Sequence, residues 1–228
     1  MKHNLFILSV ALVMFQTFVS CNTNKGNNPD NPKSEESAVQ STSSQNNGNG
    51  IIIESVMKDN TRQYYKIISP KEVGITNYYA YYASNGFKDY DYKGYVTIPE
   101  TITHEGTTYS VTCVLGGGSK NDSERIYSAF YNSTELKGVT LPSTINKIET
   151  CAMNLMKEYV PGHEYVNDFT LTCLSTTPPE MGQQSPDLPQ PVGWDWKFAY
   201  ATIKVPASSL EQYKAAWKGY NDHIFAID

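Results

Sequence analysis

An excess of basic charge is the first thing that this sequence lacks. Its 228 residues contain 18 Lys and Arg against 23 Asp and Glu, which gives a formal net charge of −5. Proteins that bind DNA or RNA present clustered lysines and arginines to the phosphates, and docking on anionic lipid needs a similar patch. The dispersed, mildly acidic balance therefore argues against nucleic acid as a partner and against electrostatic docking on membranes.

The chain also lacks a hydrophobic run long enough to cross a membrane. The run Leu5–Phe15 near the start has eleven residues, whereas a spanning helix needs about 20. It is typical of a signal peptide over residues 1–20. The following Phe18-Val19-Ser20-Cys21 resembles the lipobox of bacterial lipoproteins, which implies that the Cys21 thiol carries a diacylglyceryl anchor. An ordinary secretory signal with an incidental Cys21 is the alternative.

Apolar residues are almost absent from residues 22–50, which are rich in Asn, Ser, Gly and Gln. Such a segment cannot bury enough surface to offset the entropy that is lost on ordering. We therefore expect a disordered tether over residues 21–50, which at about 5–6 Å × √n spans on the order of 30 Å. It would hold the body at the outer membrane, on the cell surface or on the periplasmic face.

Catalytic and metal-binding motifs are missing as well. The four histidines lie far apart, and no H-E-x-x-H, C-x-x-C or G-x-S-x-G pattern occurs. Gly116-Gly117-Gly118 lacks the Lys-Ser/Thr pair of a phosphate-binding loop and indicates a flexible loop instead. We therefore predict that the protein is not an enzyme, has no catalytic residues and binds neither a metal nor a cofactor. A hydrolase, the alternative, would need a cleft with convergent carboxylates.

Cysteine is scarce, with four residues in the chain. Once Cys21 is assigned to the lipid, Cys113, Cys151 and Cys173 remain, so at most one disulfide can form within the body. A bond between Cys113 and Cys151 is one interpretation for an oxidising compartment. Buried thiols that pack as small apolar side chains are the other, and we favour it.

Helical periodicity is weak before the last 25 residues. From Ile51 onward, β-branched and aromatic runs instead alternate with Gly, Pro and Asn, which is typical of strands and turns. Within this pattern, the segment Val96-Thr-Ile-Pro-Glu-Thr-Ile102 recurs as Val139-Thr-Leu-Pro-Ser-Thr-Ile145. In each copy alternate residues are apolar, as a strand requires, and proline then removes a backbone donor. One unit cannot enclose its own apolar face, so neighbouring units must stack. An unrelated β-sandwich with a coincidental match is the alternative.

The flanks of this repeat resemble a known family. Ala129-Phe130-x-x-Ser133-x-x-Leu136-x-x-Val139-x-Leu141-Pro142-x-x-Ile145-x-x-Ile148 is similar to the unit of BspA-like leucine-rich-repeat surface lipoproteins. The resemblance covers about residues 60–228 and implies a stacked scaffold that attaches to host or bacterial proteins. The chain departs from the family pattern because Ser133 replaces a frequent Cys and insertions occupy residues 154–168 and 183–196.

One helix is predicted, near the C-terminal end. The segment Ser208-Ser209-Leu210-Glu211 has the form of a capping box, in which the Ser208 hydroxyl and the Glu211 carboxylate satisfy backbone N–H groups. Leu210, Tyr213 and Trp217 share one face at helical spacing. We expect this helix to close the end of the core.

Aromatic residues are the candidate ligand-binding groups. The chain has 17 tyrosines, nine of them between residues 64 and 95. Exposed rings offer a large contact area at low entropy cost, although tyrosine is also common in strands for packing alone. The candidates are Tyr79, Tyr81, Trp194 and Trp196, the last two from a proline-rich insertion.

Together these features predict a β-rich α/β fold, a short irregular leucine-rich-repeat-like solenoid with an N-terminal β-hairpin cap and a C-terminal helix cap. After the signal peptide and the tether, we expect a Tyr-rich β cap over residues 51–95 and the repeat domain over 96–228. The predicted function is a lipid-anchored, non-catalytic envelope protein that binds or adheres to a protein ligand. A glycan-binding accessory lipoprotein of a polysaccharide uptake system and a structural envelope protein without soluble ligand are the alternatives.

Overall fold

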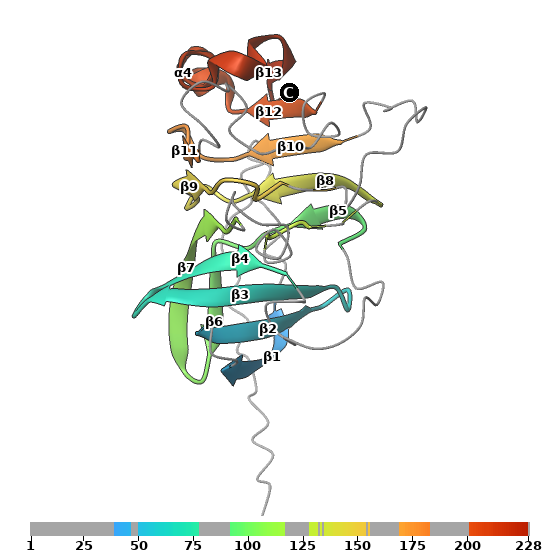
Figure 1. Ribbon diagram of the computed structural model, residues 1–228, viewed down its shortest axis with the longest axis vertical. Helices are drawn as coiled ribbons and strands as arrows, with labels where there is room; N and C mark the ends of the chain where they lie inside the picture. Colours follow the sequence, from blue (N-terminus) through green and yellow to red (C-terminus); the bar gives the residue numbers. More distant parts are fainter. Residues whose placement is uncertain are drawn as a thin grey trace, which may run out of the picture. The chain divides into compact units, whose positions relative to one another are not determined.

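Two β-sheets make up most of the structure, a computed structural model (Figure 1). It describes residues 39–46, 50–77, 92–116, 128–131, 133, 135–153, 155, 169–182 and 201–227. All of these belong to the unit Ser34–Asp228, whereas a second unit, Met1–Lys33, lies outside the described residues. Among the described residues there are thirteen strands, one α-helix and two short 3-10 helices.

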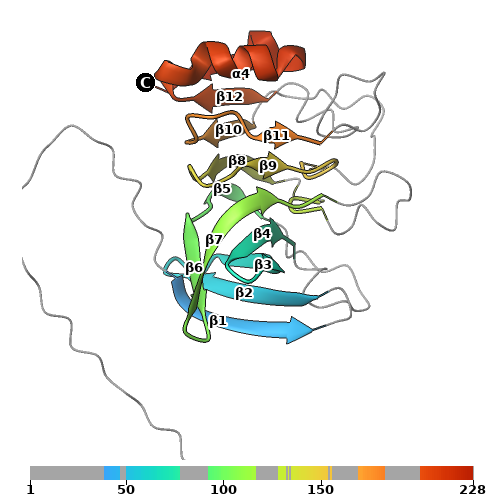
Figure 2. The same ribbon diagram turned by 90° about the vertical axis from the view of Figure 1, so that its left-hand side faces the viewer.

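The larger sheet, called the mixed sheet below, has eight strands in the order β1-β2-β3-β4-β7-β9-β11, with β6 paired to β7. Neighbours from β1 to β4 are antiparallel, whereas β4, β7, β9 and β11 pair in parallel. Strands β6 and β7 form a hairpin (Figure 2). Its turn residues Glu105 and Gly106 have φ of 47° and 75°, which is the geometry that tight hairpins use. The strands are β1 (Val39–Asn46), β2 (Ile51–Met57), β3 (Arg62–Ser69), β4 (Glu72–Thr76), β6 (Thr101–His104), β7 (Thr107–Val114), β9 (Lys147–Ile148) and β11 (Glu180–Met181).

The second sheet, called the parallel sheet below, has five strands in the order β13-β12-β10-β8-β5, and every pair in it is parallel. The two repeated segments lie side by side here, with Val96 opposite Val139. The ladder continues past the strand end, because the Ile98 amide donates to the Thr140 carbonyl at 2.9 Å. The strands are β5 (Gly94–Thr97), β8 (Leu136–Leu141), β10 (Thr170–Cys173), β12 (Thr202–Val205) and β13 (Ile224–Ala226).

One hydrophobic core lies behind the parallel sheet and joins both sheets. Alternate strand residues point to the same face, and the paired registers align one buried residue from each of the five strands. No member of this row is more than 4% exposed. The row is Val96, Val139, Leu171, Ile203 and Ile224. The buried alternate residues of the five strands, including one from each recurring segment, thus supply part of the core.

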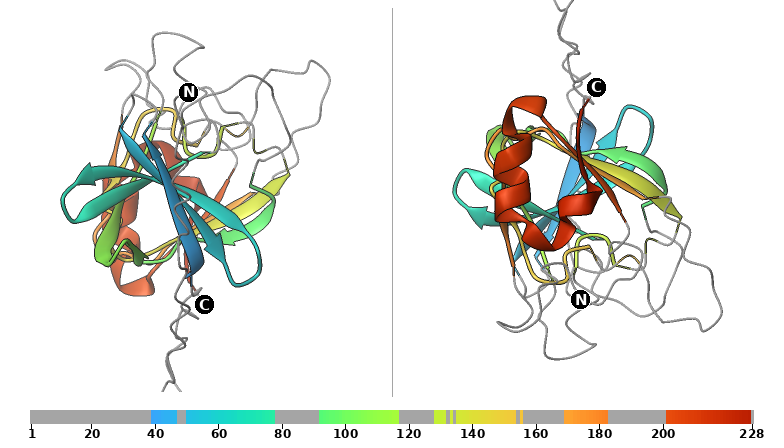
Figure 3. Two further views of the ribbon diagram at one scale, coloured as in Figure 1. Left: turned by 90° about the horizontal axis from the view of Figure 1, so that it is seen from below. Right: turned by 90° about the horizontal axis from the view of Figure 1, so that it is seen from above.

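The C-terminal segment covers the end of the parallel sheet with the 3-10 helix η1 (Ala207–Ser209), helix α4 (Leu210–Ala216) and the 3-10 helix η2 (Lys218–His223), as Figure 3 shows from above. Tyr213 and Trp217 are buried, as their helical spacing predicted. The predicted capping box does not form. Ser208 lies within η1, the N-cap of α4 is Ser209, and no side chain caps the helix.

The predicted fold class, a β-rich α/β solenoid, is wrong. The protein is mostly β-sheet, and α4 with seven residues is the one α-helix in the described part of the chain. Strands β2 to β4, from the segment predicted as a Tyr-rich β cap, are interior strands of the mixed sheet, and β6 and β7 form the hairpin within residues 94–114. The reason lies in the connections: in the described residues after Leu141 and Cys173 the chain forms turns and the two-residue strands β9 and β11, where an α/β fold would place helices.

A strand also occupies part of the predicted tether. Val39–Asn46 pairs with β2 over its whole length as β1, although Val39 is the one apolar residue in this strand. Backbone hydrogen bonding to β2 requires no apolar side chain, so composition alone did not reveal it. The other described residue of the tether is Gly50, and the rest of residues 21–50 lies outside the described part.

Candidate functional site

The residues that the sequence singled out for binding are not placed by the structure. Cys21, Tyr79, Tyr81, Trp194 and Trp196 all lie outside the described residues. The site that the described chain offers instead is the outer face of the parallel sheet, the side opposite the core.

Threonine dominates this outer face. In the register of the sheet, one row across the strands consists of Thr97, Thr140, Thr172, Lys204 and Phe225. Each of these residues is exposed or half-buried, in contrast to the buried row behind it. Strand neighbours are about 4.8 Å apart, so the hydroxyl groups of the three threonines form a regular series.

A second row lies two residues earlier along the strands. It consists of Tyr95, Gly138, Thr170 and Thr202, paired across β5, β8, β10 and β12. We call the two rows together the threonine face. Each hydroxyl can donate one hydrogen bond and accept others, and the β-branched threonine side chain is restricted at χ1. The face therefore presents polar groups that are largely ordered before any ligand arrives.

An aromatic ring stands at each of two corners of the threonine face. Tyr95 on the edge strand β5 is 78% exposed, and Phe225 on the opposite edge strand β13 is 51% exposed. The described chain has two other exposed large hydrophobic residues, Ile51 and Ile68, and both belong to the mixed sheet. Exposed aromatic residues are typical of binding surfaces.

Gly138 allows the Tyr95 ring to lie across the neighbouring strand. A Cβ atom built on Gly138 would come within 2.8 Å of Tyr95 Cδ1 and 3.0 Å of the Thr170 carbonyl oxygen. A side chain at this position would therefore collide with the ring and with backbone. The ring edge that carries Cδ1 and Cε1 occupies the space that the missing side chain of Gly138 leaves.

Hydrogen bonds from β3 and an exposed ion pair hold strand β5 and hence Tyr95 in place. The Gln63 amide on β3 donates to the Thr97 carbonyl at 2.8 Å, and Tyr65 donates to Gln63 Oε1. At the start of β5, Lys93 Nζ lies 2.8 Å from Glu135 Oε1. Burial raises the pKa of Tyr65 well above its usual value, so its hydroxyl remains a donor.

Two charged or polar side chains, Glu54 and His104, are buried in the mixed sheet. Glu54, which is 7% exposed, lies 2.7 Å from Arg62 Nη1 and accepts from the Tyr64 hydroxyl at 3.2 Å. His104 Nδ1 contacts Thr42 Oγ1 at 3.0 Å and links β6 to β1, whereas His104 Nε2 has no hydrogen-bond partner. Among the described residues, no group of three or more His, Cys, Asp or Glu side chains is arranged to hold a metal ion.

Cys113, Cys151 and Cys173 are buried thiols and not disulfides, in agreement with the interpretation favoured from the sequence. Burial raises the pKa of Cys113 to about 12, and the nearby Glu149 carboxylate adds to the shift. Burial likewise raises the pKa of Cys173 to about 12. The thiolate is the nucleophilic form, so both groups are inert at neutral pH.

No helix in the described part of the chain is both long and apolar enough to span a membrane.

Comparison with known proteins gives little beyond this geometry. No family model matches the chain, and no curated protein does. Among solved structures, the pneumococcal vaccine antigen PcpA is similar, at 15% sequence identity and a TM-score of 0.27. The match covers 75% of this chain and 33% of that chain, so this protein spans about a third of its length. The likeness is too weak to support an argument about fold or function.

Proposed function

We propose that this protein is a non-catalytic binding or adhesion protein of the cell envelope, which contacts its ligand with the threonine face. One observation carries the proposal: a flat series of partly exposed hydroxyl groups lies between two exposed aromatic rings, on a sheet whose other side is fully buried. Because the core behind the sheet is closely packed, any rearrangement of the sheet would cost free energy. The face is therefore a preformed surface. Preformed surfaces lose little entropy on binding.

A relationship to BspA-like surface proteins is part of the proposal. It is supported by the order of the motifs along residues 60–228 and by the parallel pairing of the two recurring segments through Val96 and Val139. For that family, the resemblance implies attachment to other proteins. Fold does not fix function, so the ligand of this chain must be argued from its own surface.

Attachment to the outer membrane through Cys21 is the second part of the proposal. Each buried CH₂ of an acyl chain contributes about 0.8 kcal/mol, so several chains hold a protein firmly. We expect the full chain to incorporate radiolabelled palmitate and to sediment with outer membranes, whereas Cys21→Ser remains unlabelled and is found in the soluble fraction. Cys113→Ser, which changes a cysteine of the body, should be labelled normally. Unlabelled wild-type protein would contradict the lipid anchor.

Adhesion tests the binding role. Beads that carry the full chain should adhere saturably to at least one surface in a panel of extracellular-matrix proteins, mucin and polysaccharides. We expect the double variant Tyr95→Ala, Phe225→Ala to lose at least tenfold in adhesion, because exposed aromatic residues dominate binding energy. Ile68→Ala removes another exposed large hydrophobic side chain, 44% exposed, from the mixed sheet and is the control.

The proposed function would be contradicted by two results. One is the absence of saturable adhesion to every surface in the panel. The other is adhesion that the double variant retains in full.

A further inference from the structure

The size of the threonine face bears on the class of its ligand. Five strands about 4.8 Å apart, with about four residues of 3.3 Å each, give a projected area of roughly 300 Å². A stable protein–protein interface takes about 800 Å² from each partner. Even though accessible area exceeds projected area, the face is small for a stable interface with a folded protein, and its dimensions suit a single extended chain that lies across the strands.

The charge of the face is nearly neutral. The five strands contain two lysines, Lys137 and Lys204, and no acidic residue. Recognition of an anionic polymer or surface takes clusters of several basic residues. Two lysines on separate strands do not form such a cluster, and a cationic ligand would find no carboxylate on these strands. A neutral ligand fits the face best.

The chemistry of the two rows matches that of a sugar chain. Threonine hydroxyls can exchange donor and acceptor roles with the hydroxyls of a neutral glycan, and their restricted side chains lose little entropy in doing so. An aromatic ring presents a negative π face, against which the C–H bonds of a sugar ring can pack. Tyr95 lies over Gly138 at one corner of the face and remains 78% exposed, so its ring is accessible for such stacking.

We infer that the threonine face binds a neutral polysaccharide whose chain runs across the five strands, from Tyr95 on β5 towards Phe225 on β13. Tyr95 supports one sugar ring by stacking, and the hydroxyls of Thr140 and Thr172 hydrogen-bond to the next residues of the chain. This inference rests on the proposed function, because it names the ligand class for the same surface.

Native gel electrophoresis with polysaccharide in the gel tests the inference. The purified full chain should migrate more slowly in gels that contain at least one of yeast mannan, dextran or barley β-glucan, and at its normal rate in polygalacturonate. Tyr95→Ala should raise the apparent dissociation constant about tenfold through loss of the stacking surface. The double variant Thr140→Val, Thr172→Val keeps the β-branched shape and removes only the hydroxyls, and we expect a further loss of about tenfold. Ile68→Ala should behave as wild type.

Each outcome decides between the two proposals. Retardation by a neutral polysaccharide that depends on Tyr95 and on the threonine hydroxyls supports the inference. Retardation by polygalacturonate alone, or equal retardation of all variants, overturns it. If matrix proteins hold the beads through Tyr95 and Phe225 while no neutral polysaccharide retards the chain, the glycan inference fails and the proposed function stands. Failure of both assays removes both proposals.

Discussion

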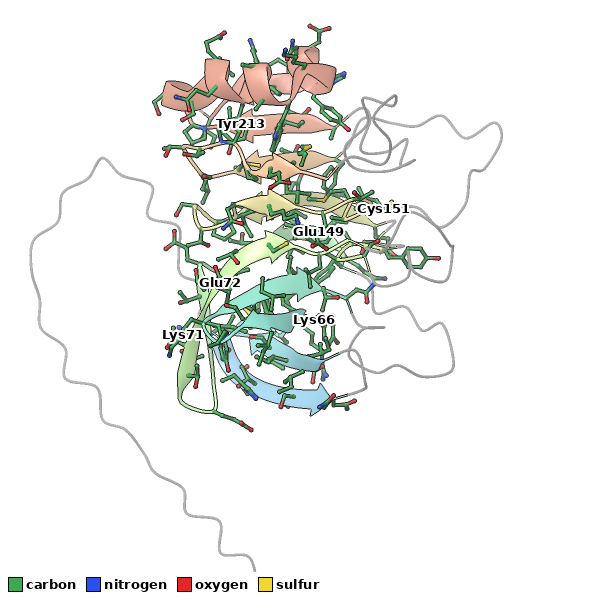
Figure 4. The ribbon with its side chains drawn as sticks, turned by 60° about the vertical axis from the view of Figure 1, so that its left-hand side comes forward. Lys66, Lys71, Glu72, Glu149, Cys151 and Tyr213 are labelled. Atoms are coloured by element: carbon green, nitrogen blue, oxygen red, sulfur yellow. The ribbon has the colours of Figure 1, made fainter. Side chains whose placement is uncertain are left out.

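Replacing Tyr213 by alanine should lower the free energy of unfolding by about 3–5 kcal/mol, the cost of truncating a large buried aromatic residue. Tyr213 is fully buried, and Figure 4 marks its place in the helical segment at the end of the sheets. Its ring centroid lies 4.9 Å from that of Trp217 at an interplanar angle of 84°. Its hydroxyl donates to the Ser175 carbonyl at 2.9 Å. Urea denaturation followed by circular dichroism measures the change.

Tyr213→Phe separates the ring from the hydroxyl. This variant keeps the contact with Trp217 but leaves the Ser175 carbonyl without its donor, which costs about 1–3 kcal/mol. Gln212→Ala, at an exposed position of the same helix, should change stability by no more than about 0.5 kcal/mol. If Tyr213→Ala costs no more than Tyr213→Phe, the ring does not close the core.

Local periodicity explains which parts of this fold the sequence predicted. The spacing of Tyr213 and Trp217 places both on one face of a helix, whatever the rest of the chain does. The recurring segments at Val96 and Val139 likewise predicted strands, since alternation is a property of four or five consecutive residues. Both segments form strands in the structure, where Val96 and Val139 are buried and lie opposite each other.

The fold class could not be predicted in the same way, because pairing between distant strands decides it. The parallel contact of β4 with β7 joins Val73 to Val111 across the chain, and no local pattern in either strand specifies that partner. Strand β1 is a clearer case, since its Ser- and Gln-rich sequence indicated disorder. Tertiary context thus overrode local propensity at β1, whereas at β4 and β7 it chose the partner.

The candidate site shows a different limit. Tyr95 was not among the binding candidates predicted from the sequence, which were Tyr79, Tyr81, Trp194 and Trp196. Exposure on an ordered surface depends on the neighbouring strand, here on Gly138. Gly138 lies opposite Tyr95 on the neighbouring strand and leaves room for its ring. This pairing can be recognised only once the register of the two strands is known.

Gly116→Ala should also lower the free energy of unfolding strongly, by about 3 kcal/mol or more, because the added methyl group overfills a site that cannot expand. A Cβ atom on Gly116 would lie 1.8 Å from the Thr150 carbonyl oxygen. Gly182 approaches the same residue, with its Cβ position 2.3 Å from the Thr150 amide nitrogen. Figure 4 labels Glu149 and Cys151, which flank this turn. The turn after β9 is therefore packed against glycines that follow β7 and β11.

Gly94→Ala is the matched control for this steric effect. Gly94 has a φ of 62°, and nothing lies within 4 Å of its Cβ position, so the substitution should cost only about 1–2 kcal/mol of backbone strain. Both variants are compared by urea denaturation with the wild type. A cost for Gly116→Ala no greater than that for Gly94→Ala would contradict the close packing of the turn. Backbone atoms of Thr150 cannot rotate away as a side chain can, which is why we expect Gly116→Ala to be the more damaging of the two.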